Sequence, residues 1–105
     1  MVKPSDFRAI VRRGRRTTTA STLIYRVERD PADPARFGFI VAKTVGNAVE
    51  RNLVRRRMRA VCRSIVDAGG SGSDVVVRAL PGSAQRDWTS LSAEMHAILD
   101  PALIP

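Results

Sequence analysis

The segment from Asn47 to Asp67 constrains the fold of this chain most strongly. Asn47, with Glu50 three residues later, is typical of a capped helix start, and the glycine- and serine-rich run from Gly69 ends the helix. Apolar residues recur within it at i, i+4, i+7 and i+11, namely Val54, Met58, Val61 and Ile65. This spacing places them on one stripe of a helix. We therefore expect a long helix that packs this stripe against a sheet.

A second face of the same helix is strongly basic. Helical geometry gathers a set of polar residues within roughly 100° of arc, away from the apolar stripe; they are Asn52, Arg55, Arg56, Arg59 and Arg63. No acidic residue stands between Glu50 and Asp67. Like charges four positions apart cost an isolated helix a few tenths of a kcal/mol per pair, and a merely solvated face usually mixes signs. The pattern favours a polyanionic partner, whereas Arg57 points elsewhere and is interpreted as ordinary surface charge.

The composition of the whole chain supports the same kind of partner. Its 105 residues include 18 Lys and Arg against 10 Asp and Glu, a net charge of +8, and arginine outnumbers lysine sixteen to two. The planar guanidinium group matches phosphate bidentately and stacks on bases, which favours nucleic acid over a membrane surface. No apolar run reaches about 18 residues and no hydrophobic signal segment is visible. We expect one domain over residues 1–105, in the cytoplasm, with no membrane contact.

The remaining elements are predicted from periodicity and turn residues. Phe7, Ile10 and Val11 follow cap chemistry and predict a short helix that Gly14 ends. Runs rich in β-branched or apolar residues predict two or three strands before the long helix and one after it, over 17–29, 37–43 and 74–80. Helical spacing returns over 88–99, with Asp87 or Thr89 as cap. The fold class is α+β, with a small, mostly antiparallel sheet of about four strands and three helices in the order αβββαβα.

Side chains able to carry catalysis are sparse. His96 is the only histidine and lies among apolar helix residues, without the orienting partner and nucleophile that acid–base chemistry needs. The lone cysteine, Cys62, excludes an internal disulfide and a cysteine-based zinc site, and is expected in the core. Phe37 and Phe39 are interpreted as core residues, and Trp88 as a hydrophobic anchor in preference to a ring that stacks on a base. We expect no catalytic residue and no metal site in the protein itself.

The stretch around the long helix resembles a known family. Residues 42–59 read Ala-Lys-Thr-Val-Gly-Asn-Ala-Val-Glu-Arg-Asn-Leu-Val-Arg-Arg-Arg-Met-Arg. This closely resembles the signature of the bacterial ribonuclease P protein subunit: a lysine, a glycine with a small or polar residue, Ala-Val, Arg-Asn, a basic pair and a further arginine. The likeness extends over nearly the whole chain, through Asp6-Phe7, Gly14-Arg15-Arg16, Leu23-Ile24-Tyr25, and Asp74 to Val77 with Pro81.

The resemblance implies both a function and a fold. A member of this family binds the catalytic RNA of ribonuclease P and assists the removal of the 5′ leader from precursor tRNA. The cleaving groups and most of the Mg²⁺ then belong to the RNA, the protein alone is inactive, and no obligate protein partner is implied. The implied fold is ribosomal-protein-like, with a left-handed βαβ crossover, although generic statistics favour the right-handed form.

The resemblance also assigns residues to two binding surfaces. Contacts to the catalytic RNA carry over to Lys43, Arg51, Asn52, Arg55, Arg56, Arg59 and Arg63. Contacts to the leader, in a cleft of the first helix and the sheet, carry over to Phe7, Val11 and Tyr25, with Arg12, Arg13, Arg15 and Arg16 nearby. Two departures weaken particular assignments: Thr44 stands where a second lysine is common, and Val11 replaces a second aromatic residue.

Three other functions remain open at this point. A ribosomal or other structural RNA-binding protein shares the charge and the small α+β fold, and an assay of tRNA 5′ processing with the catalytic RNA would distinguish it. A self-sufficient nuclease needs a clustered set of His, Asp or Glu that the sequence does not offer. A DNA-binding module is weaker still, because no helix-turn-helix pattern precedes the arginine helix.

Overall fold

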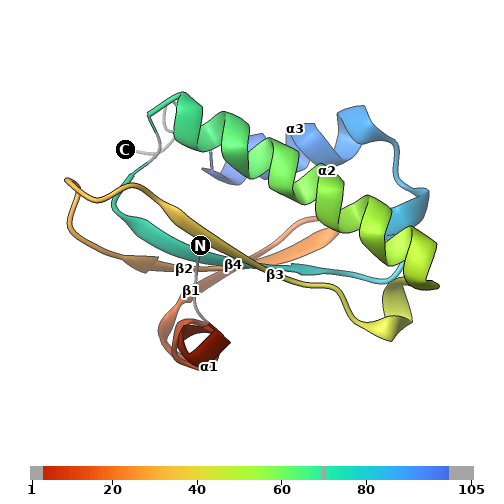
Figure 1. The fold of residues 1–105 in the computed structure, drawn as a ribbon, viewed down its shortest axis with the longest axis horizontal. Coiled ribbons are helices and arrows are strands. Elements are labelled where there is room, and N and C mark those ends of the chain that lie inside the picture. The colour runs from red at the N-terminus through yellow and green to blue at the C-terminus, as the bar shows by residue number, and fades with distance from the viewer. Residues whose placement is uncertain (1–3, 70, 100–105) are drawn as a thin grey trace.

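The computed structural model describes residues 4–69 and 71–99 of the chain. Its elements are α1 (Pro4–Arg13), β1 (Arg15–Thr18), β2 (Thr22–Glu28), β3 (Arg36–Ile40), α2 (Ala48–Asp67), β4 (Ser73–Ala79) and α3 (Trp88–Leu99), with short 3-10 turns η1 (Lys43–Val45) and η2 (Ser83–Gln85) (Figure 1). The α+β class and the order αβββαβα are therefore confirmed. No described helix combines the length and the apolar character needed to cross a membrane.

The four strands form one mixed sheet in the order β1-β2-β4-β3. β1 and β2 are antiparallel, as are β2 and β4, whereas β3 and β4 are parallel. α2 connects these two parallel strands. With α2 above the sheet and both strands running left to right, β3 lies in front of β4 (Figure 1), so the crossover is left-handed, as the family resemblance implied.

Helices cover both faces of the sheet, in three layers. α2 and α3 lie on one face and α1 lies alone on the other (Figure 1). The predicted stripe of α2 is buried in the larger core, against Val75 and Val77 of β4. A smaller core of Ile10, Tyr25 and Val76 lies beneath α1. Because both faces of β4 are covered, its apolar run is continuous instead of alternating.

The start of α2 is fixed by the capping box that the sequence predicts. The Asn47 Oδ1 accepts a hydrogen bond from the Glu50 backbone N–H at 2.9 Å, and Glu50 Oε1 accepts one from the Asn47 N–H at 3.0 Å. Gly46 has a φ of 155°, and a Cβ there would lie 2.6 Å from Glu50 Oε1. Glycine at this position therefore leaves room for the returning carboxylate.

The predicted strand boundaries needed correction. The strand predicted over 17–29 is instead divided between β1 and β2 of a hairpin that begins at Arg15, because the Thr19 hydroxyl accepts the Thr22 N–H at 3.0 Å and turns the chain. The strand predicted over 37–43 ends at Ile40, opposite Arg78 near the end of β4, and Lys43 lies in η1. Strands extend only as far as a partner strand pairs with them, and the sequence pattern does not show that limit.

The start of α3 shows which residue caps this helix and contradicts the expectation for Trp88. The Asp87 Oδ1 accepts the Ser90 N–H at 2.6 Å, so Asp87 caps this helix, and this hydrogen bond holds the pKa of the carboxyl below its usual value. Trp88, expected as a hydrophobic anchor, is 41% exposed. The buried positions of α3 are instead Leu91, Met95 and Leu99.

A buried carboxylate ties the loop between β2 and β3 to the sheet. Asp74 accepts hydrogen bonds from Arg36 Nε at 2.8 Å and Arg36 Nη2 at 2.6 Å, and from Arg29 Nη1 at 3.2 Å. Arg29 Nη2 also bonds Asp33 at 3.2 Å. The hydrogen bonds from Arg36 hold the pKa of Asp74 below its usual value, so the carboxylate stays ionised and these two arginines are largely neutralised.

Candidate RNA interface

The basic face of α2 is largely exposed, and its arginines are not paired with acidic side chains in the described part of the chain. Arg56, Arg59 and Arg63 are exposed, and within residues 4–69 and 71–99 none of the three makes an ion pair or side-chain hydrogen bond. Arg55 is partly buried and donates from Nη1 to Asn52 Oδ1 at 3.2 Å. Such a surface attracts phosphate groups and repels itself without them.

Two further residues of the predicted RNA-binding set lie at the margin of this face. Arg51 is partly buried, and its Nε is buried with no hydrogen-bond partner in the described part of the chain. Lys43 is exposed in η1, which packs against α2. The family resemblance assigned both residues to the same RNA contact as the arginine face. In the structure Arg51 is a partly buried residue of α2, whereas Lys43 is an exposed residue of η1.

Arg57 points away from the arginine face, as the helical projection predicted, but it makes a specific contact within the protein. Its Nη1 donates a hydrogen bond to the backbone oxygen of Arg86 at 2.9 Å. This contact joins α2 to the segment that precedes α3. The role of Arg57 is therefore structural, which corrects the sequence-based interpretation.

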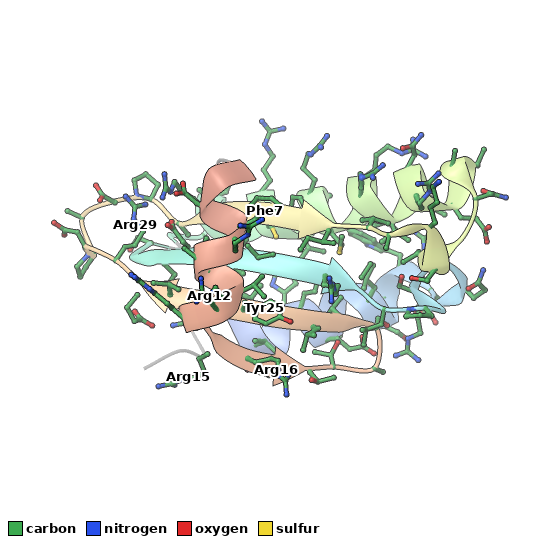
Figure 2. All side chains as sticks on the ribbon, turned by 90° about the horizontal axis from the view of Figure 1, so that it is seen from below. Phe7, Arg12, Arg15, Arg16, Tyr25 and Arg29 are labelled. Carbon is green, nitrogen blue, oxygen red and sulfur yellow. The ribbon has the colours of Figure 1, made fainter. Side chains whose placement is uncertain are left out.

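The aromatic residues predicted for the leader lie between α1 and the sheet. Phe7 and Val11 are partly buried and pack around the cluster of Ile10, Tyr25 and Val76. Tyr25 is only 7% exposed, on the sheet face beside α1 (Figure 2). Its ring thus offers much less open surface than strand alternation suggested, because α1 covers this face of the sheet.

The predicted leader arginines do not form one group. Arg12 and Arg13 are exposed and, with Arg8, line a depression at the surface of α1. Arg16 pairs with Tyr25 across β1 and β2, whereas Arg15 pairs with Arg26. Neighbouring residues of a strand point to opposite faces, so Arg16 shares the α1 face and Arg15 the α3 face. The strand register decides which of the two arginines takes which face.

Sequence reasoning missed an arginine on the α1 face. Arg78 of β4 is exposed, pairs with Leu23 of β2 and lies opposite Ile40 of β3. Both apolar neighbours are partly buried. Arg78 is the one residue of β4 that the burial pattern leaves exposed, so its charge inside an apolar strand was the available signal.

The described residues offer little for hydrolytic chemistry. Among them, no three or more His, Cys, Asp or Glu side chains come together in a way that could hold a metal ion. Burial raises the pKa of the Cys62 thiol, which disfavours the reactive thiolate. His96 is partly buried on α3.

A small α+β domain with an exposed arginine face is typical of proteins that bind polyanions. Comparison with known proteins defines it further. Residues 1–103 match the family model described as Ribonuclease P. The chain therefore belongs to the family of ribonuclease P protein components, which confirms the resemblance seen in its sequence.

Individual relatives agree with this assignment. The chain is 44% identical over 99 residues to the ribonuclease P protein component of Clavibacter michiganensis subsp. michiganensis, covering 94% of this chain and 88% of that one. It is 41% identical over 99 residues to that of Rhodococcus opacus, covering 89% and 79%.

Solved structures show the same fold. The RNase P protein of Staphylococcus aureus superposes with a TM-score of 0.83 at 24% identity, covering 97% of this chain and 93% of that one. The RNase P protein of Thermotoga maritima gives a TM-score of 0.79 at 21% identity, covering 90% and 89%. At these identities the likeness concerns the fold alone.

Proposed function

We propose that this protein binds the catalytic RNA of ribonuclease P through the arginine face of α2 and assists RNA-catalysed removal of the 5′ leader from precursor tRNA. The observation that carries the proposal is the row of exposed arginines on α2, of which Arg56, Arg59 and Arg63 make no ion pair within residues 4–69 and 71–99. In this proposal the cleaving groups and the Mg²⁺ belong to the RNA, the protein alone is inactive, and the holoenzyme works in the cytoplasm.

The arginine face suits a phosphate backbone. From Arg56 to Arg63 the helix rises by about 10 Å, so the exposed guanidinium groups can contact several phosphates in succession. Each contact releases condensed counterions, which makes binding strong at low salt and weak at high salt. Folded RNA presents such closely spaced phosphates, and no groove readout by α2 is required.

We place the leader on the α1 side of the sheet. On that face Arg16 lies opposite Tyr25, and Arg78 lies opposite the partly buried Leu23. The two guanidinium groups would pair with leader phosphates, and the side chains of Leu23 and Tyr25 would contact base faces. Neither contact reads base edges, so leaders of different sequence would be accepted.

Reconstitution tests the proposal. The protein with its catalytic RNA should cleave a precursor tRNA at the mature 5′ end faster than the RNA alone at low Mg²⁺, and the protein alone should show no cleavage. His96→Ala should leave turnover within a few fold. A structural RNA-binding protein would bind without stimulating cleavage, and a self-sufficient nuclease would cleave without RNA; either result contradicts the proposal.

A further inference from the structure

The arginine face of α2 borders an open strand edge. β3 is the outermost strand on its side, so its outer edge pairs with no strand of the described sheet. α2 lies over this edge, and α3 lies farther back (Figure 1). Between α2 and β3 runs a groove of about 260 Å³, lined by Phe37 and Phe39 of β3 and by Arg59 and Arg63 of α2.

The aromatic ring of Phe39 forms one wall of the groove and packs against the larger core. Phe39 pairs with Val77, which lies in the larger core, so its side chain faces α2. It is partly buried and packs against that core, while Phe37 is only 8% exposed. A ring held by the core on one side and open to a groove on the other is a rigid surface on which a flat group can stack.

The rim of the groove is positively charged. Arg59 and Arg63 stand one helical turn apart and are exposed, with no ion pair among residues 4–69 and 71–99. Arg36 also lines the groove, but Asp74 neutralises it. The only carboxylate among the described lining residues is Asp67, at the end of α2.

These features fit a ligand that is flat and apolar on one side and anionic on the other, which describes a nucleotide. The groove is smaller than the pockets of about 300 to 1,000 Å³ that hold drug-sized ligands, so it suits a single base. A base within a duplex hides its faces, whereas an unpaired base exposes them for stacking.

We propose that this groove receives one unpaired nucleotide of the catalytic RNA, with its base against Phe39 and its phosphate between Arg59 and Arg63. This inference rests on the proposed function and adds the kind of RNA element that α2 recognises. The stacked base would let α2 distinguish an unpaired element from a duplex, a distinction that phosphate contacts alone do not supply.

Two substitutions at one position test the stacking contact in the complex of the full chain with the catalytic RNA. Phe39→Leu, which keeps an apolar side chain but removes the ring, should weaken binding about tenfold. Phe39→Tyr keeps the ring and should bind within about twofold of the parent. Neither changes the charge, so the salt dependence should stay the same. Thermal unfolding of each variant sets a temperature at which all three proteins are folded.

Two results in this assay would overturn the inference: unchanged affinity of Phe39→Leu, or equal weakening by Leu and Tyr. Failure of the proposed function would look different, because the parent protein itself would not bind the catalytic RNA specifically.

Photocrosslinking provides an independent measurement. A benzophenone amino acid at position 39 of the reconstituted complex should crosslink to one nucleotide, mapped by primer extension, that chemical probing shows to be unpaired. A crosslink only to paired nucleotides contradicts the inference. A crosslink to a second copy of the chain would show that the open edge of β3 receives another strand, and would equally overturn it.

Discussion

Removing charge from the middle of the arginine face of α2 is the most direct test of the proposed contact with the catalytic RNA. We consider the double variant Arg56→Gln with Arg59→Gln. Both side chains are exposed and unpaired within the described residues, and glutamine has nearly the same helix propensity as arginine. The free energy of unfolding should therefore change little, while two positive charges are lost.

The expected loss of affinity follows from counterion release. Each phosphate contact contributes about 0.7 to 0.9 to the slope of log K against log salt concentration, so the double variant should flatten that slope by about 1.4 to 1.8. If the counterion contribution is taken as zero at about 1 M salt, the double variant should bind about 25- to 60-fold more weakly than the parent at about 0.1 M salt. A titration of the catalytic RNA at four or five salt concentrations measures both quantities.

Arg57→Gln is the matched control, because it removes the same charge from the next residue of the same helix. Arg57 donates to the Arg86 backbone oxygen at 2.9 Å, away from the arginine face. Its loss should reduce the stability of the fold by about 1 kcal/mol and change the salt slope by much less than one contact. Equal slopes for Arg57→Gln and Arg56→Gln would refute the assignment of two distinct faces.

Three further predictions address the rest of the molecule. Arg16→Gln should lower the preference of the holoenzyme for precursor over mature tRNA about fivefold, whereas Arg15→Gln, on the opposite face of β1, should leave it unchanged; equal effects would contradict the placement of the leader. Gly14→Ala should destabilise the fold by about 1 to 3 kcal/mol in denaturant unfolding, because its Cβ would lie 2.5 Å from a backbone oxygen of α1 and 3.0 Å from a backbone nitrogen of β2. Asp74→Asn should cost about 2 kcal/mol at neutral pH, where the carboxylate bonded to Arg36 is ionised. Since the folded-state pKa of Asp74 lies below its ordinary value of 3.8, this stabilisation is complete above that value and is lost as pH falls through the folded-state pKa. The difference between variant and parent should therefore shrink in acid, and a constant difference would contradict the ionic contribution.

The sequence by itself determined the features that depend on neighbouring residues. The capping box of Asn47 and Glu50, the buried stripe of α2 and its arginine face all follow from spacings within about 20 residues, because helix geometry fixes which side chains share a face. The signature around this helix also identified the family, which the comparison with known proteins confirmed. These properties required no knowledge of what packs against the helix.

Only the tertiary structure decided the features that depend on distant pairings. The register of β1 against β2 decides that Arg16, and not Arg15, shares the α1 face, and the covering of the sheet by α1 buries Tyr25. The strand order leaves the outer edge of β3 open beside α2, and thereby creates the groove at Phe39. Residues far apart in the sequence meet at each of these places, and a one-residue shift of register would exchange the two faces of a strand. Local patterns therefore located the helix with the arginine face, whereas the surfaces beside it were set by how the sheet is assembled.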